Sequence, residues 1–126
     1  MASGLTLDSG ALIAGEKRAR RFLVIWAAAL ERGARITVPA VVLAQVWRGN
    51  SPGIARLLPA CSIEEMEESR AKLVGRLLAR ARSADIVDAA VVVGAAARGD
   101  AIVTSDPGDI GRLVAVTGAR IPVLAI

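Results

Sequence analysis

Hydrophobic and polar positions form short alternating blocks, which predict strands and helices in alternation. Short apolar runs that end at polar or turn residues predict strands at residues 5–7, 35–38, 60–63, 101–104 and 121–125. Apolar residues three or four positions apart predict helices at residues 11–14, 17–30, 40–48, 54–58, 64–81, 84–97 and 110–116. This order predicts an α/β fold with a central parallel sheet of four to five strands and helices on both faces.

Turn and capping residues mark several boundaries of these elements. Gly33 suits the left-handed position after a helix, and Pro39 fits the first turn of the next helix. Pro122 indicates either that the last strand lies at a sheet edge or that Pro122 is its first residue. Asp109 is expected to cap the helix at 110–116, which would leave Asp106 free at the end of the preceding strand.

The composition favours a single domain with an apolar interface. At 126 residues the chain has room for one core, but its hydrophobic fraction of 54% and mean hydropathy of +0.51 are high for so small a domain. The longest apolar run, residues 22–30, is shorter than the roughly 20 residues of a membrane span. Asp8 interrupts any secretory signal, and Cys61, the sole cysteine, is expected to pack in the interior of a cytoplasmic protein. The surplus apolar surface is therefore expected to form a dimer or partner interface.

Charge and residue types narrow the chemistry. A net charge of +4 favours polyanionic partners, and the basic run at 17–21 is either a solvated helix end or a contact for RNA phosphates. The absence of histidine excludes Ser-His-Asp and Cys-His catalysis and histidine-bound zinc. Any catalysis must therefore use carboxylates, although the glutamates at 64, 65, 67 and 68 are expected to form an exposed helix face.

Three aspartates are placed to meet at one edge of the predicted sheet. Asp8 and Asp106 follow strands, and Asp88 lies near the start of a very apolar helix, with Asp85 on the same helix face. Such carboxylates repel one another unless a divalent cation neutralises them, and their oxygen ligands suit Mg²⁺ or Mn²⁺. With a polyanionic substrate this predicts metal-assisted phosphodiester hydrolysis, in which Thr104 or Ser105 orients a carboxylate or the attacking water. The alternative for Asp8 is a purely structural helix cap.

Four segments, in order, resemble a known family: residues 6–14, 38–48, 85–92 and 102–110. They resemble the PIN domain of the VapC type, the ribonuclease half of bacterial toxin–antitoxin pairs. The resemblance implies that residues 1–126 form one PIN-like domain with a three-layer α/β/α fold, which cleaves RNA with Mg²⁺ or Mn²⁺. It also implies a homodimer and inhibition by a small VapB-like antitoxin. By position, Asp8, Asp88 and Asp106 match the family's three metal-binding aspartates, with Asp85 as an alternate to Asp88 and Asp109 as an auxiliary residue.

Gln45 departs from the family pattern, in which glutamate is usual. Glutamine can still bind a metal ion through its carbonyl oxygen, but one negative charge is lost. At an effective dielectric near 20, a unit-charge pair 4 Å apart is worth about 4 kcal/mol before desolvation. Metal binding is therefore expected to weaken, above all for a second ion. The chain is either a Mg²⁺-dependent endoribonuclease or a catalytically weakened PIN protein that acts by binding RNA or a partner. The glutamine is compatible with a natural variant, a degenerate inactive protein or a deliberate disarming substitution.

A receiver domain is a third class that gathers aspartates at a sheet edge. It requires a lysine after a late strand, and the only lysines of this chain, Lys17 and Lys72, lie elsewhere.

Overall fold

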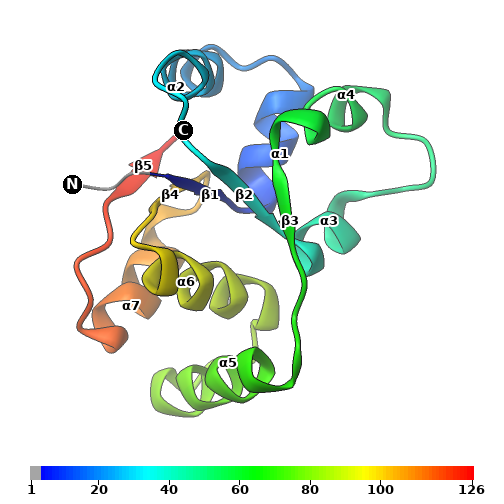
Figure 1. Cartoon of the computed structure of the whole chain (residues 1–126). Helices are drawn as coiled ribbons and strands as arrows, with labels where there is room; N and C mark the ends of the chain where they lie inside the picture. Colours follow the sequence, from blue (N-terminus) through cyan, green and yellow to red (C-terminus); the bar gives the residue numbers. More distant parts are fainter. Residues whose placement is uncertain (1–3) are drawn as a thin grey trace.

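The computed structural model describes residues 4–126, which form a five-stranded parallel sheet with the order β3-β2-β1-β4-β5 (Figure 1). The strands are β1 (Leu5–Leu7), β2 (Ile36–Pro39), β3 (Ser62–Glu64), β4 (Ala101–Thr104) and β5 (Val123–Ala125). The predicted parallel sheet is therefore confirmed. β5 lies at an edge, as Pro122 indicated.

Helices cover both faces of this sheet. They are α1 (Ser9–Glu16), α2 (Arg20–Glu31), α3 (Ala40–Val46), α4 (Pro52–Ala55), the 3₁₀ turn η1 (Leu58–Ala60), α5 (Glu68–Ala81), α6 (Ile86–Arg98) and α7 (Pro107–Thr117). Figure 1 shows α6, α7 and α5 below the sheet and α1, α2 and α4 above it. This arrangement is the expected three-layer α/β/α fold.

The core lies on both sides of the central strands, because every residue of β1 and β4 is buried. α1 packs on β1 and β4 from one side, and α6 packs on β1, β2 and β4 from the other. Leu12 of α1 and Val91 of α6 are fully buried, as is Ile102 of β4. Such burial on both faces is typical of a parallel sheet, and it explains why the strands read as continuous apolar runs. No helix among the described residues is both long and apolar enough to span a bilayer.

Several boundaries differ from the prediction. Pro39 ends β2 in place of starting a helix, because its ψ of 138° is extended. The short helix covers Pro52–Ala55 in place of residues 54–58, and Leu58–Ala60 form a separate 3₁₀ turn, η1. β3 begins at Ser62 and not at residue 60.

The N-terminus of α7 also corrects the prediction. Asp106 caps this helix by accepting a hydrogen bond from the Asp109 N–H, and Pro107 occupies the first helical position. Asp109 is therefore a residue of the first turn and not the cap, and Asp106 is not left free. A proline at the first position has no N–H to satisfy, so the helix starts earlier than the apolar periodicity indicates.

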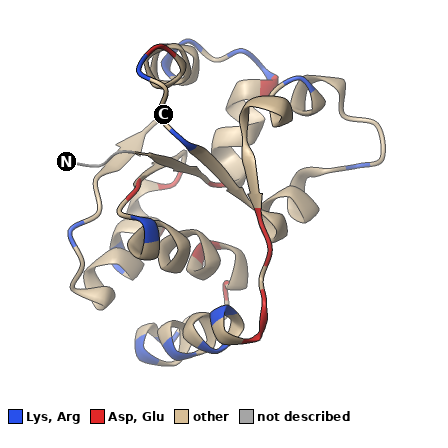
Figure 2. Cartoon of the chain, in the orientation of Figure 1, with Lys and Arg blue, Asp and Glu red and all other residues tan. Residues whose placement is uncertain are grey.

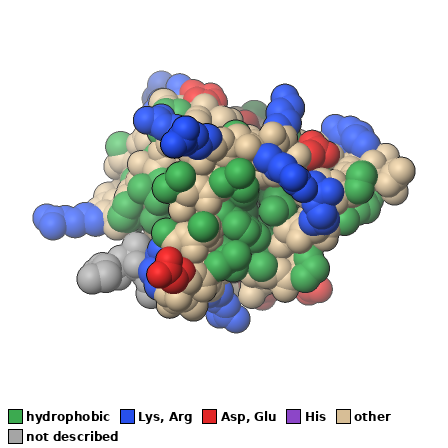
Figure 3. Space-filling model, turned by 90° about the horizontal axis from the view of Figure 1, so that it is seen from above, with side chains coloured by type: hydrophobic (Ala, Val, Ile, Leu, Met, Phe, Trp, Pro, Cys, Tyr) green, Lys and Arg blue, Asp and Glu red, His purple; other side chains and the backbone are tan. Residues whose placement is uncertain are grey.

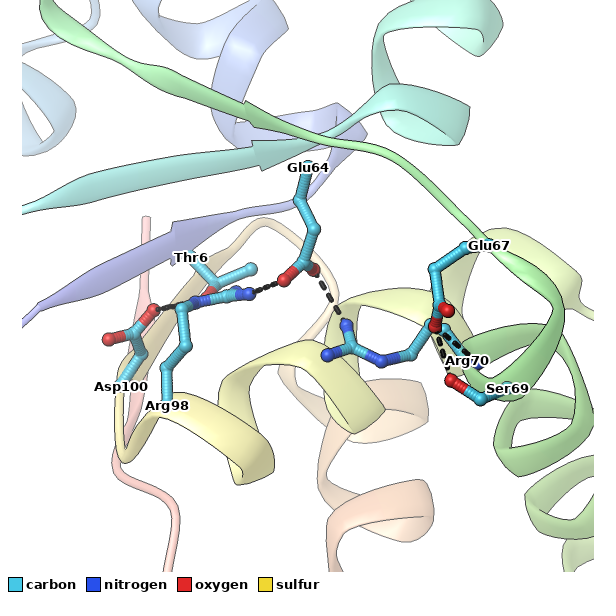
Figure 4. A network of polar contacts seen from close by, with 7 residues as sticks. All are labelled: Thr6, Glu64, Glu67, Ser69, Arg70, Arg98 and Asp100. Atoms are coloured by element: carbon cyan, nitrogen blue, oxygen red, sulfur yellow. Dashed lines mark hydrogen bonds and ion pairs between the residues drawn. The ribbon is translucent and has the colours of Figure 1, made fainter.

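Glu64 belongs to a network of polar contacts below the sheet and not to an exposed helix face (Figure 4). Glu64 lies in β3, where it pairs with Pro39 of β2, and α5 begins four residues later, at Glu68. Its carboxylate accepts hydrogen bonds from Arg98 and, at 2.8 Å, from Arg70. Arg98 also donates to Asp100 at 2.9 Å and to the Thr6 hydroxyl at 2.8 Å. The buried charges in this network are therefore paired, as a buried charge requires.

Candidate functional site

Asp8 lies where β1 ends and α1 begins, and it is only 4% exposed. Its Oδ1 accepts a hydrogen bond of 2.8 Å from the Ala11 N–H, so Asp8 is the N-cap of α1. Burial raises the pKa of Asp8 above its ordinary value, hydrogen bonds from Thr104 and Ala11 lower it, and the charge of Asp106 raises it. Asp8 is therefore both a helix cap and a carboxylate that faces another acid.

Thr104 connects the two aspartates that follow strands. β1 and β4 are neighbours, with Leu7 opposite Val103, so Asp8 and Thr104 extend their strands side by side. The Thr104 side chain is fully buried and hydrogen-bonds to the Asp8 carboxyl. Its Oγ1 also accepts a hydrogen bond of 2.8 Å from the Asp106 N–H. One hydroxyl thus fixes the Asp8 side chain and the backbone that carries Asp106.

Asp88 belongs to a third element, α6, and lies near Asp8 and Asp106. It lies in the first turn of α6, and its N–H donates a 2.9 Å hydrogen bond to Oδ1 of Asp85, the N-cap of that helix. Burial raises the pKa of Asp88 to about 7, together with the charges of Asp85, Asp8 and Asp106. Charges more than about 10 Å apart are largely screened. The effects of Asp8 and Asp106 on the pKa of Asp88 therefore place the three residues in one neighbourhood at the carboxyl edge of the sheet.

The oxygen atoms of these carboxylates suit Mg²⁺ or Mn²⁺, but the carboxylates lie too far apart to form a complete metal site. Carboxylates whose mutual repulsion raises their pKa are stabilised by a divalent cation. In residues 4–126, however, no group of three acidic, cysteine or histidine side chains is close enough to hold one ion as they stand. Asp8 and Asp106 each hold a backbone N–H at a helix start, and Asp85 does so for α6. Side chains of this set would therefore have to rotate before they could share one ion.

Gln45 lies on the exposed side of α3, and its Oε1 accepts a hydrogen bond from the hydroxyl of Ser9. Ser9 follows Asp8 directly, so the glutamine is tied to the residue next to the buried aspartate. The amide oxygen that was expected to substitute for a glutamate ligand is therefore already bonded within the protein.

Gly10 and Ser105 form a close contact that the sequence analysis missed. A Cβ atom built on Gly10 would lie 1.7 Å from Ser105 Oγ and 2.8 Å from Ser105 Cβ. Only a glycine allows the start of α1 to approach the end of β4 this closely. The Ser-Gly pair after Asp8 is the local signal, but its partner lies 95 positions away along the chain. Ser105 is therefore a packing neighbour of α1.

Asp109 lies at the border of this site. It is exposed and 3.7 Å from Arg112 across one turn of α7. Its backbone, and not its carboxylate, contacts Asp106. The structure thus brings Asp8, Asp88, Asp85 and Asp106 together with Thr104, and it pairs Asp109 with an arginine.

The fold and the site define a three-layer α/β/α protein with aspartates facing one another at the carboxyl edge of its sheet. No protein-family model matches the chain, and no curated protein matches it. Among solved structures it is similar to a VapBC2 structure from Rickettsia felis bound to a promoter DNA fragment, with a TM-score of 0.72, 13% identity and coverage of 97% of this chain and 98% of that one. DNA-bound VapBC from Salmonella typhimurium gives a TM-score of 0.70 at 15% identity, covering 98% of both chains. FitAcB from Neisseria gonorrhoeae gives 0.64 at 18% identity, covering 95% and 96%. The resemblance to VapC-type proteins is thereby confirmed at the level of the fold.

Proposed function

We propose that the chain is the toxin component of a type II toxin–antitoxin pair, a metal-dependent endoribonuclease with Asp8, Asp88 and Asp106 as its ligands for Mg²⁺ or Mn²⁺. The observation that carries this proposal is the shared electrostatic neighbourhood of the three aspartates, which come from three different elements. The fold shared with VapBC and FitAcB structures supports it.

Each side chain has a defined task in this proposal. A bound divalent cation would activate a water molecule and offset the charge of the transferring phosphoryl group. Asp8 is held by the Ala11 N–H and by Thr104, so Asp88 and Asp106 would have to turn toward it to share a cation. Thr104 is a positioning residue, because it acts through Asp8 and through the backbone of Asp106. Asp88 has a pKa of about 7 without a metal ion, so it would release its proton when the cation binds.

A catalytically weakened protein that binds RNA or a partner is the second candidate, and Gln45 favours it. The Gln45 oxygen is bonded by Ser9, and a neutral amide adds no charge to attract a second cation. The weakened form retains the fold and the aspartates but loses the rate that a full set of carboxylates supports.

A partner surface of the kind an antitoxin would cover is present on the upper side of the molecule. Figure 3 shows hydrophobic side chains gathered in the middle of this face, with lysine and arginine side chains around them. Ile13, Leu23 and Val24, of α1 and α2, are 38%, 40% and 64% exposed. A separate apolar groove of about 340 Å³ is lined by residues of α3 and η1, among them Leu43 and Trp47. A small antitoxin or a second copy of the chain would bury such surfaces.

Basic residues offer contacts for the RNA substrate. Figure 2 shows lysine and arginine positions along α5 and at the start of α2. Phosphate contacts of this kind make binding dependent on salt.

The experiment that tests the proposed function compares RNA cleavage by the unaltered chain, Gln45→Glu and Asp8→Asn, each with Mn²⁺ and with EDTA. The endoribonuclease proposal predicts Mn²⁺-dependent cleavage that Asp8→Asn abolishes. A large gain in Gln45→Glu over a nearly inactive unaltered chain identifies the weakened protein. Cleavage that persists in EDTA or in Asp8→Asn contradicts both candidates.

A further inference from the structure

A small polar cavity lies under the β2–β3 side of the sheet. Its volume is about 190 Å³, and it is lined by Arg35, Thr37, Ser62, Ile63, Glu64 and Arg98. A single water molecule requires only about 10–15 Å³ of such volume. The cavity therefore has room for a ligand larger than one water molecule.

Thr37 is the unsatisfied group of this cavity. It is 2% exposed, and its Oγ1 has no hydrogen-bond partner among residues 4–126. Thr37 is in register with Thr6 of β1 and Ser62 of β3, so three hydroxyl-bearing residues form a row across one face of the sheet. Thr6 in this row is already bonded to Arg98 and Asp100, whereas Thr37 is not. A buried hydroxyl without a partner is unfavourable. Its oxygen has almost no accessible surface, so a polar ligand would satisfy it once the side chains over the hydroxyl move aside.

The charges around the cavity favour an anion. Glu64 is a lining carboxylate, but Arg70 binds its Oε1 and Arg98 binds its Oε2, so its charge is neutralised (Figure 4). Asp100 is paired with Arg98 in the same network. Arg35 is exposed at the rim and forms no ion pair with the residues that the structure describes. Its positive charge is the one that remains for a ligand.

We propose that this cavity binds a small oxyanion of the phosphate class. The hydroxyls of Thr37 and Ser62 donate to its oxygens from the sheet, and the Arg35 guanidinium pairs with its charge from the rim. Donors on two strands and a rim arginine reach such an anion from different sides, which suits a tetrahedral group. The phosphate is either free or the terminal group of a nucleotide, because both present the same atoms to these donors. The site is separate from Asp8, Asp88 and Asp106 and does not depend on the metal proposal.

The test is thermal unfolding of the full chain with inorganic phosphate, in EDTA, against chloride at the same ionic strength. Phosphate is expected to raise the Tm of the unaltered chain by a few degrees. Thr37→Val removes the hydroxyl and keeps the shape of the side chain. This variant is expected to match or exceed the Tm of the unaltered chain without phosphate and to lose the response to phosphate.

Arginine variants separate a specific site from general charge effects. Arg35→Gln is expected to weaken the apparent phosphate affinity about tenfold or more, which corresponds to about 1.4 kcal/mol. Arg56→Gln makes the same change of charge at an exposed position outside the cavity lining and is expected to keep the full response. Amide NMR shifts on adding phosphate are expected at Thr37 and Ser62.

Two further comparisons identify the source of the phosphate group and the results that would overturn the proposal. A nucleoside 5′-monophosphate that shifts the Tm at lower concentration than inorganic phosphate identifies a nucleotide end, and an equal or weaker effect identifies the free anion. Absence of any shift with either probe means that the cavity holds water only, and it overturns the proposal. A shift that Thr37→Val and Arg35→Gln retain in full also overturns it.

Discussion

The fully buried hydroxyl of Thr104 hydrogen-bonds to the carboxyl of Asp8, the residue that follows the neighbouring strand β1. The same oxygen accepts the Asp106 N–H at 2.8 Å. A single side chain of β4 therefore links two of the three aspartates on which the proposed activity rests. Without this hydroxyl, the positions of both Asp8 and Asp106 are expected to be less fixed.

Thr104→Val is expected to lower the free energy of unfolding by about 1–3 kcal/mol, because a buried carboxyl and a backbone N–H each lose a partner. It is also expected to weaken Mn²⁺ binding, and Thr104→Ser is expected to restore both. Urea unfolding and a Mn²⁺ titration measure the two effects.

Thr117→Val is the matched control, since the Thr117 hydroxyl also donates to a carbonyl, at 2.6 Å, and accepts an N–H, at 3.1 Å, but at the end of α7. It is expected to reduce stability without changing Mn²⁺ affinity. Equal losses of affinity in the Thr104 and Thr117 variants would show that Thr104 has no positioning role.

Asp88 is expected to make the metal-free protein less stable as pH rises. Its pKa is about 7 in the folded chain against an ordinary 3.8, so between these values the folded state binds more protons than the unfolded state. The stabilising effect of the folded-state proton is complete below the unfolded pKa and is lost as pH rises to about 7. Asp8, whose pKa is also raised, acts in the same direction.

Urea unfolding in EDTA across this pH range measures the effect. Asp88→Asn is expected to flatten the decline and to be more stable than the unaltered chain at pH 8. Asp109→Asn, at an exposed position beside Arg112, is expected to keep the decline. An unchanged dependence of stability on pH in Asp88→Asn would contradict the raised pKa of Asp88 and its repulsion by Asp8 and Asp106.

Gly10→Ala is expected to destabilise the protein by about 1–3 kcal/mol, because the new Cβ would overlap Ser105. The double variant Gly10→Ala/Ser105→Gly removes the overlapping atoms and is expected to recover much of the loss. Gly111→Ala is the control: it lies in α7 with open space around it, so alanine is expected to stabilise the helix by about 0.4–1 kcal/mol. Thermal unfolding of the three variants decides the matter, and a harmless Gly10→Ala would show that α1 can move away from β4.

Arg98→Met is expected to destabilise the fold by about 3–5 kcal/mol, since Glu64 and Asp100 would each lose a partner in a largely buried network. Lys72→Met breaks an exposed pair with Glu68, 2.7 Å apart, and is expected to change the free energy of unfolding by less than about 0.5 kcal/mol. Denaturant unfolding compares the two, and similar effects would show that the network adds nothing beyond a surface pair.

Local patterns predicted the elements but not the contacts between them. β1 and β4 were predicted with their observed limits, because short apolar runs between polar residues leave little choice. Gly33 has a φ of +68°, as its place after a helix indicated. Glu64 was misassigned because nothing local shows that its strand pairs with β2.

The aspartates of the candidate site were predicted from the sequence, but the polar contacts around them were not. Asp8, Asp88 and Asp106 were predicted because strand ends and a helix start are local signals, and the sheet order places them at the same edge. Their role as metal ligands stays a prediction. The Ser9–Gln45 hydrogen bond and the unpaired hydroxyl of Thr37 depend on approaches between distant segments. Such approaches are set by packing and have no signature in one stretch of sequence.

Asp8, Asp88 and Asp106 are proposed to hold one divalent cation together, and a Mn²⁺ titration followed by electron paramagnetic resonance measures this binding. The unaltered chain is expected to bind Mn²⁺ saturably. Asp8→Asn, Asp88→Asn and Asp106→Asn are each expected to lose that binding, and Asp109→Asn is expected to retain it. Binding that survives all three substitutions, or no binding by the unaltered chain at millimolar Mn²⁺, would contradict this proposal.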